Sequence, residues 1–320
     1  MIIAQITTDN REAYERYDRL VPEFGTAPTA LFAGLSDRKD VELHILSCSK
    51  RAMSSPEKLG ERTWFHGVHV PKFGWLRGGY GGCVLGLRHR LGQIGPDLVH
   101  GQGTERECAL GAVFSGFPNV VTIHGNMARV ARLYDARVGS YHWLTARLET
   151  LALRRAGGVF CNSSYTESVV RGRGFPRWLV PNAIRPSFLG PAASRPPQGV
   201  PILLNVGVII PLKRQVELLS MARRLRGEGF RFQLRFAGHL GGDEEYNRRF
   251  RELLDSMAGT AFHDGALNEG ELRDWLDAGT AMVHTSAEEA CSVAVMEGIA
   301  RNLKILAFNV GGNPDLVRGV

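Results

Sequence analysis

The chain has 320 residues, of which 44% are hydrophobic and 22% charged, a composition typical of a soluble globular protein with room for two domains. No stretch reaches the roughly eighteen apolar residues of a membrane span. The five cysteines are scattered without zinc or disulfide spacing, which excludes a disulfide-stapled domain and favours a cytoplasmic location.

The net charge is +7, and the excess lies in the first half of the chain. Residues 1–182 hold 23 Lys and Arg against 16 Asp and Glu, whereas residues 183–320 hold 16 of each. A basic half can face phosphate, anionic lipid or nucleic acid. No nucleic-acid-binding motif accompanies it, so nucleic acid is not an expected partner. A solvated basic surface is an equally good interpretation.

Short apolar runs alternate with helical patterns along the first half. The N-terminus lacks the charged region and cleavage site of a signal peptide, so it is predicted to be a strand. Strands are predicted at Ile2–Thr7, Val41–Ser47, His66–Val70, Leu98–His100, Val120–Ile123, Val159–Cys161 and Trp178–Val180. Helices are predicted near Thr26–Leu35, Arg106–Phe114, Tyr141–Arg155 and Ser164–Arg171. This alternation indicates crossover units and a parallel sheet.

A stretch rich in Pro, Gly, Ser and Ala interrupts this rhythm at residues 185–200 and is the predicted linker. A second alternating unit follows. Its strands are predicted at Ile202–Val206, Gln233–Ala237, Ala261–His263, Met282–His284 and Lys304–Phe308. Its helices are predicted near Gln215–Arg226, Glu244–Met257, Glu269–Trp275 and Val293–Ala300. We therefore expect an α/β protein with two doubly wound, Rossmann-like domains, at residues 1–184 and 201–320, facing each other across a cleft.

Two glutamates eight residues apart, Glu289 and Glu297, are the most informative feature of the chain. Ser292 is the predicted N-cap of an apolar helix, which puts Glu289 in the loop before the helix and Glu297 inside it. Two carboxylates beside a helix N-terminus suit a polyhydroxyl ligand that carries phosphate, such as a nucleotide sugar. An internal Arg or Lys partner for Glu297 is an equally weighted alternative.

Further candidates follow predicted strands, where parallel sheets bind ligands. Lys213 and Arg214 come after a turn at Gly207, near a predicted helix start. Two cations at this position could bind an anion. The alternative is that both side chains simply extend into solvent. His124 follows a strand end and could contact a sugar hydroxyl, although a lone histidine is more often structural.

Two glycine turns also precede predicted helices. Gly25 and Thr26 could let the backbone reach a substrate on the side of the first domain. The turn at residues 311–312 leads to Asn313, a predicted N-cap, and tight turning alone explains it equally well. No Gly-x-Gly-x-x-Gly or P-loop follows a strand, which disfavours a nicotinamide dehydrogenase, and no metal-ligand cluster stands out.

Several short sequence motifs of the chain together resemble those of a known family. The glutamate pair within EEACSVAVMEGIA (288–300) resembles the signature of the retaining GT-B glycosyltransferases of family four. Seven more strings occur in that family's order: DLVHGQG (97–103), VTIHGN (121–126), CNSSYTESVV (161–170), LVPNAI (179–184), LLNVGVIIPLKRQ (203–215), FHDGALNEGEL (262–272) and VGGNPDLV (310–317).

The resemblance implies transfer of a sugar from a nucleotide diphosphate sugar to a glycan or lipid-linked acceptor, with retained anomeric configuration and with neither metal nor cofactor. It assigns catalytic contact with the transferred sugar to His124 and Glu289, and acceptor-side contact to Gly25 and Thr26. It assigns donor binding to Gly207, Lys213, Arg214, Phe262, Cys291, Ser292, Val293 and Glu297. In this assignment Glu297 binds the ribose hydroxyls and Lys213 neutralises the diphosphate.

Three features depart from the family pattern. Val208 stands where an arginine usually follows the glycine of the phosphate loop. Residues 290–292 read Ala-Cys-Ser instead of Gly-aromatic-Gly. The chain stops at Val320, where the family continues with further helices, so we expect an incomplete C-terminal domain. A nucleotide-sugar epimerase on the same fold and a non-catalytic sugar-nucleotide-binding subunit are therefore kept as alternatives.

The acceptor side gives one more expectation. The segment at residues 71–91 mixes aromatic, aliphatic and basic residues, and it could rest on the inner face of a membrane near a lipid-linked acceptor. A loop and helix packed on the sheet is the favoured interpretation of the two.

Overall fold

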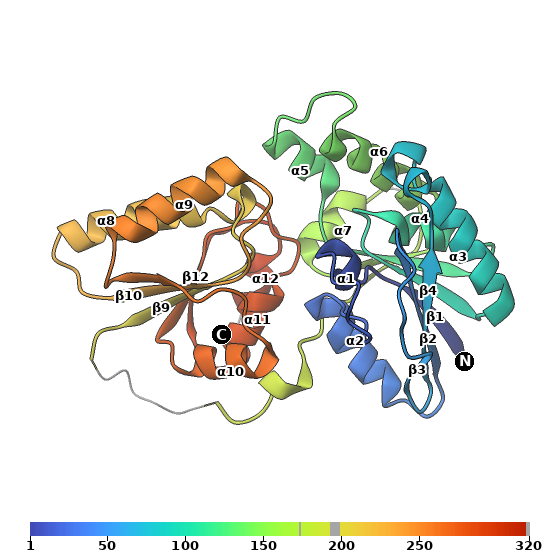
Figure 1. Cartoon of the computed structure of the whole chain (residues 1–320), viewed down its shortest axis with the longest axis horizontal. Helices are drawn as coiled ribbons and strands as arrows, with labels where there is room; N and C mark the ends of the chain where they lie inside the picture. Colours follow the sequence, from blue (N-terminus) through green and yellow to red (C-terminus); the bar gives the residue numbers. More distant parts are fainter. Residues whose placement is uncertain (173, 193–198, 318–320) are drawn as a thin grey trace. The chain divides into compact units, whose positions relative to one another are not determined.

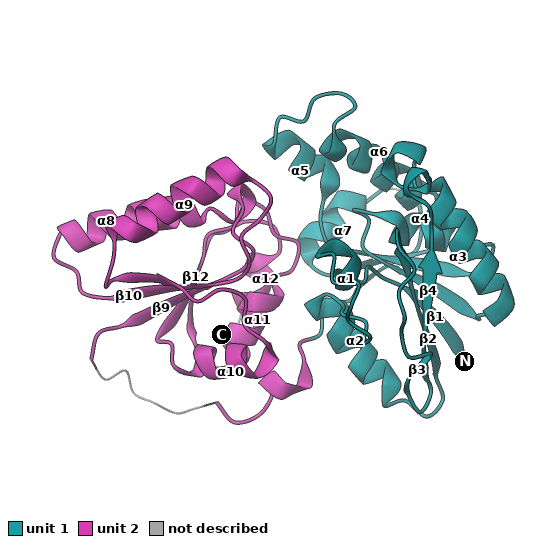
Figure 2. Cartoon of the chain, viewed as in Figure 1, with its two compact units in different colours: residues 1–183 teal, residues 184–320 magenta. Residues whose placement is uncertain are grey.

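The computed structural model describes residues 1–172, 174–192 and 199–317, and it divides the chain into two compact units, Met1–Ala183 and Ile184–Val320 (Figures 1 and 2). Each unit has its own sheet, parallel apart from the edge strand β3 in the first unit, and its own hydrophobic core. The two α/β sheets confirm the predicted fold class. The predicted cleft concerns the placement of the two units and stays a prediction.

The first unit is built on an eight-stranded sheet with the order β3-β4-β2-β1-β5-β6-β7-β8, in which β3 alone pairs antiparallel among the described strands. Its strands are β1 Ile2–Ile6, β2 Glu42–Ser49, β3 Lys58–Gly60, β4 Thr63–His69, β5 Leu98–Gln102, β6 Asn119–Ile123, β7 Val159–Cys161 and β8 Arg177–Leu179. The predicted strands all lie at or within a few residues of observed ones, whereas β3 was not predicted.

Alternation of side chains along each strand separates the two faces of this sheet. The helices are α1 Asn10–Ala13, α2 Thr26–Ser36, α3 Gly81–Ile94, α4 Glu107–Val113, α5 Met127–Leu133, α6 Tyr141–Arg155 and α7 Ser164–Val170, with short 3-10 turns η1 Lys72–Gly74 and η2 Leu76–Gly78. Ala4 and Ile6 of β1 belong to the large core with α3, α4 and α6, whereas Phe32 of α2 packs on the opposite face against Leu43 and Ile45.

The second unit is a five-stranded parallel sheet with the order β11-β10-β9-β12-β13. Its strands are β9 Ile202–Val206, β10 Gln233–Ala237, β11 Ala261–His263, β12 Ala281–His284 and β13 Lys304–Ala307. Helices α8 Gln215–Gly227 and α9 Glu244–Ser256 lie on one side of this sheet, and α10 Glu269–Asp277, α11 Val293–Ala300 and α12 Asn313–Val317 on the other (Figure 1). Asn313 is the first residue of α12 rather than its N-cap, a one-residue difference from the prediction.

The start of the predicted linker is packed onto the second unit. The 3-10 turn η3 Pro186–Phe188 buries Phe188 completely in a core with Leu276 of α10 and Val295 of α11. Arg301 donates hydrogen bonds to the carbonyls of Gly190 and Pro191, both at 2.9 Å. Residues 185–192 therefore behave as part of the second unit, and residues 193–198 of the predicted linker lie outside the described part.

Two properties extend over both units. All five cysteines are buried and reduced. None of the helices in the described ranges combines the length and the apolar character that crossing a bilayer requires.

Candidate functional site

A partly buried ion pair joins two loops at the carboxyl edge of the second sheet. Lys213 ends a 3-10 turn η4 Pro211–Lys213 after β9, and its Nζ lies 2.6 Å from Oε2 of Glu289, which follows β12. Nε2 of His284, the last residue of β12, lies 3.1 Å from the same oxygen. Because β9 and β12 are neighbouring parallel strands, their loops meet at one edge. Burial opposes ionisation of Glu289, but Lys213 and His284 outweigh it and lower the pKa of Glu289 to about 2.

Gly311 and Gly207, both with positive φ, let the loops around this ion pair approach closely. Gly311 has φ of 52°, and a Cβ there would lie 1.7 Å from the carbonyl oxygen of Glu289. The N–H of Gly312 donates to that same carbonyl at 3.0 Å. Gly207 has φ of 153° and packs against the stem of Lys213. The Gly311–Gly312 turn therefore positions the Glu289 loop through its backbone.

The N-terminus of α11 lies three residues beyond Glu289. Ser292 is the N-cap, as predicted, and its Oγ accepts from the N–H of Val295 at 3.3 Å. Cys291 is buried, and Val293 begins the helix. Unsatisfied N–H groups and the helix dipole at this end favour an anion.

Glu297, one turn into α11, is paired with an arginine. Nη2 and Nε of Arg185 donate to Oε1 of Glu297 at 2.7 and 3.0 Å, and Glu297 is 2% exposed. Burial raises the pKa of Glu297 in spite of this partner. The alternative of an internal arginine partner is thus present in the structure. Within the described residues Oε2 receives no hydrogen bond, so half of the carboxylate is left for another donor.

The other donor-side candidates are more spread out. Arg214 adopts the left-handed conformation, with φ of 57°, as the residue before α8, so this helix begins two residues after Lys213. Phe262 lies on the edge strand β11, two strands from β9, with the guanidinium of Arg235 over its ring at 5.5 Å. Val208 is 37% exposed.

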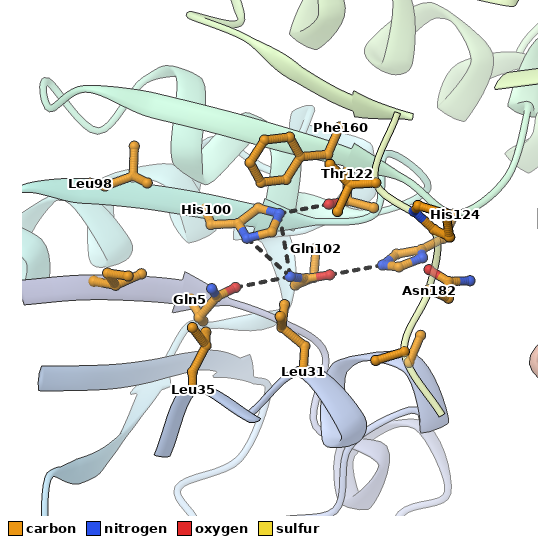
Figure 3. Close-up of a pocket in the computed structure, with 15 residues that line it drawn as sticks. Gln5, Leu31, Leu35, Leu98, His100, Gln102, Thr122, His124, Phe160 and Asn182 are labelled. Carbon is orange, nitrogen blue, oxygen red and sulfur yellow. Dashed lines mark hydrogen bonds between the residues drawn. The ribbon is translucent and has the colours of Figure 1, made fainter. Parts of the chain in front are cut away.

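In the first unit, His124 lies just past β6 and ends a chain of buried polar side chains (Figure 3). Nε2 of His124 is 2.9 Å from Oε1 of Gln102, and Nε2 of Gln102 donates to Oε1 of Gln5 at 2.9 Å. Since the amide nitrogen is engaged with Gln5, the oxygen faces His124 and requires an N–H there. Nδ1 of neutral His124 is therefore the unprotonated ring nitrogen. Burial lowers the pKa of His124, which keeps the imidazole neutral near pH 7.

This chain of polar groups forms the floor of a cavity of about 250 Å³ within the first unit (Figure 3). Its walls are apolar and come from α2, β1, β5, β7 and the segment after β8. Gly25 is the residue before α2, with extended backbone, and Thr26 is its exposed first residue. The neighbouring Ala27, rather than Gly25 or Thr26, lines the cavity.

Three functional candidates were missed in the sequence. His284 was predicted only as a strand residue, Arg185 was assigned to the linker, and Gln102 was read only as part of a resembling string. The alternation of His100 and Gln102 with apolar neighbours along β5 was the available signal, because it puts both on one face of the sheet.

The comparisons with known families decide what these sites belong to. Residues 30–188 match the family described as Glycosyltransferase Family 4, and residues 191–319 match Glycosyl transferases group 1. The chain is a glycosyltransferase of family four. The glycosyltransferase thus carries a family match over nearly all of its length, with the boundary between the matches at residues 188–191.

Solved structures establish the fold of this glycosyltransferase as GT-B. Sucrose-phosphate synthase from Thermosynechococcus elongatus matches with a TM-score of 0.72 at 16% identity, covering 98% of this chain and 82% of the other. HepE of Anabaena, in complex with UDP and glucose, matches with a TM-score of 0.69 at 15% identity and the same two coverages. WaaG, a glycosyltransferase involved in lipopolysaccharide biosynthesis, matches with a TM-score of 0.69 at 14% identity, covering 99% and 84%. No curated protein sequence gives a significant match.

Proposed function

We propose that this glycosyltransferase is a retaining hexosyltransferase that needs no metal. It moves a sugar from a nucleotide diphosphate sugar to a glycan or lipid-linked acceptor, in the synthesis of a cell-surface polysaccharide or glycoconjugate. It works in the cytoplasm, with peripheral contact to the inner face of the membrane through its basic first unit.

The ion pair of Lys213 and Glu289 beside the N-terminus of α11 carries this proposal. A diphosphate leaving group develops negative charge as the glycosidic bond breaks, and preorganised positive charge lowers that barrier. Lys213 supplies one cation, and the N–H groups at the start of α11, whose N-cap Ser292 lies three residues after Glu289, supply a partial positive charge. These two groups take the place that a metal ion would otherwise fill.

Glu289 and His124 are assigned to the transferred sugar. Glu289 stays ionised at every physiological pH, since its pKa is about 2, and it accepts hydrogen bonds from sugar hydroxyls. His124 presents a neutral imidazole with its lone pair on Nδ1. The free Oε2 of Glu297 suits a ribose hydroxyl, while Arg185 neutralises the charge of that carboxylate. Crystals of HepE with UDP-glucose support a nucleotide-sugar donor.

Calorimetric titration of the chain with UDP, GDP and ADP sugars, without metal, tests the donor site. We expect one nucleotide to bind, and Lys213→Ala to weaken its binding about 10- to 100-fold, the worth of one charge-assisted contact to phosphate. Lys304→Ala is the matched control, because this lysine is exposed on β13 of the same unit. Equal donor affinity in wild type and Lys213→Ala would exclude the proposed role of Lys213.

Turnover with and without an acceptor then separates the reaction classes. A transferase forms product only when an acceptor is present, and the product keeps the anomeric configuration of the donor sugar. Conversion of the nucleotide sugar without an acceptor would instead identify an epimerase.

A further inference from the structure

Two segments of the first unit concentrate its positive charge. Residues 71–91 hold four Lys and Arg and no Asp or Glu, and residues 125–141 hold three against one. These two segments account for six of the seven excess positive charges among residues 1–182. A basic surface that merely kept the protein in solution would not require this concentration.

The same segments display the most exposed large hydrophobic side chains of the described residues. Phe73, in η1, is 85% exposed, and Val138, between α5 and α6, is 81% exposed. Single exposed apolar residues are common on protein surfaces. Here each one stands among basic residues: Lys72 and Arg77 flank Phe73, while Arg132 and Arg137 precede Val138.

The two segments lie on the same side of the first unit. Tyr80 is the residue before α3, Tyr141 begins α6, and α4 packs against both of these helices. Arg106, just before α4, has its guanidinium 5.4 Å from the ring centre of Trp75. The charge of Arg106 also opposes the effect of burial, which raises the pKa of Tyr141. One arginine is thus in electrostatic range of both segments.

The turn that carries Phe73 is fixed by the packing of its neighbours Gly74 and Trp75 against Val70. Trp75 is 6% exposed, and its Nε1 donates to the carbonyl of Val70 at 3.0 Å. A Cβ at Gly74 would lie 2.7 Å from Cγ1 of Val70, so the turn is packed tightly onto the end of β4. Phe73 is therefore presented on a fixed turn and needs little ordering when it binds.

We propose that residues 71–91 and 125–141 form a docking surface for the headgroup layer of an anionic lipid bilayer. Phe73 and Val138 enter the interface, and Lys72, Arg77, Arg132 and Arg137 bind headgroup phosphates. Nucleic acid would engage the cations but would gain little from an exposed valine. The proposal deepens the proposed function, because a lipid-linked acceptor requires such contact, but the surface binds lipid whether or not transfer occurs.

Co-sedimentation of the full chain with vesicles tests this surface. We expect binding to vesicles of phosphatidylglycerol and phosphatidylcholine at low salt, loss of that binding at high salt, and weak binding to pure phosphatidylcholine. Lys72→Gln with Arg77→Gln should lower the partition coefficient about 25-fold, at about fivefold for each charge. Phe73→Ser with Val138→Ser should lower it at least about 10-fold while leaving the salt dependence unchanged.

A matched control comes from the second unit, where Phe230 is 60% exposed beside the exposed Arg231. Phe230→Ser with Arg231→Gln should bind vesicles as the wild type does, and thermal melts should show that every variant is folded. The proposal is overturned if the wild type does not bind anionic vesicles at low salt, or if the Phe73 and Lys72 variants bind like the control. Nucleotide-sugar titration of the same variants reports separately on the transferase assignment.

Discussion

Nζ of Lys213 and Oε2 of Glu289 lie 2.6 Å apart, so the cation assigned to the donor diphosphate is held by the carboxylate assigned to the transferred sugar. Each group thereby keeps the other charged and oriented while both are largely removed from water. Binding a diphosphate at Lys213 gives this cation a second anionic partner, and the two roles are energetically linked.

Glu289→Gln tests this linkage. The change removes the competing negative charge from Lys213 and preserves the shape of the side chain. We expect nucleoside diphosphate affinity to be equal to or higher than in the wild type, while kcat falls about 100-fold because the transferred sugar loses a charged hydrogen-bond acceptor. Titration with the nucleotide and steady-state kinetics measure the two effects. A parallel loss of nucleotide affinity would show that Glu289 supports the diphosphate instead.

The pH dependence of stability follows from the same carboxylate. The pKa of Glu289 is about 2 in the folded state against an ordinary value of 4.5. Its contribution to the free energy of unfolding is therefore complete above about pH 4.5 and is lost as the pH falls from 4.5 to about 2. We expect Glu289→Gln to be less stable near pH 7 by up to about 3 kcal/mol, with the difference vanishing at low pH. Urea unfolding at several pH values measures it, and Glu252→Gln, in an exposed pair on α9, is the control.

Arg185 and Glu297 form a second ion pair near α11, in which Glu297 is buried, and breaking this pair leaves a buried charge. We expect Arg185→Met to lower the free energy of unfolding by about 3 kcal/mol. Arg224→Met removes the partner of Glu228 in an exposed pair and should cost less than about 1 kcal/mol. Equal losses in the two variants would mean that Glu297 is satisfied without Arg185.

Gly311→Ala should displace the loop of Glu289. The new Cβ would meet the carbonyl oxygen of Glu289 at 1.7 Å, and φ of 52° is unfavourable for alanine. Gly259→Ala is a matched control, since Gly259 has φ of 77° with open space around its Cβ position. Gly259→Ala should cost about 1 kcal/mol of conformational strain, and Gly311→Ala clearly more, together with loss of donor binding. Urea unfolding and calorimetry of both variants measure the difference.

Gln102→Glu should change the protonation of His124. A carboxylate 2.9 Å from Nε2 favours the imidazolium ion, so the pKa of His124 rises from the value that burial has lowered. Nitrogen NMR of histidine-labelled protein should show His124 as the Nε2–H tautomer in the wild type and as the charged form in the variant near pH 7. Gln93→Glu, on the exposed end of α3, serves as the control. An unchanged His124 spectrum in Gln102→Glu would contradict the contact.

The sequence predicted elements well where the local signals agree. The helix at Val293–Ala300 was placed correctly because Ser292 is a good N-cap and the following residues are nearly all apolar. The strand ends at Val206 and His284 were also predicted correctly, and they bring Lys213 and Glu289 to one edge of the sheet. Pairing between them follows from the neighbouring positions of β9 and β12, which depend on strand order and not on local pattern.

The remaining features depend on contacts distant in sequence. Arg185 is 112 residues from Glu297, and its proline-rich surroundings resemble a linker although Phe188 anchors them in a core. His284 reads as a buried strand residue until Glu289 folds back against it. The helix α3 was expected only in outline, because glycines at its first turn weaken the helical pattern.

The burial of all five thiols makes the chain convenient for site-directed labelling. Maleimide reagents need an accessible thiolate, and enclosed native cysteines react slowly with them. A cysteine introduced at Val138 or at Phe230 would therefore carry a spin label or fluorophore at a single defined position without prior removal of the native cysteines. Because the native thiols are buried in the core, fluorescence and spin-label measurements at such introduced cysteines can show which surface of the protein contacts a bilayer.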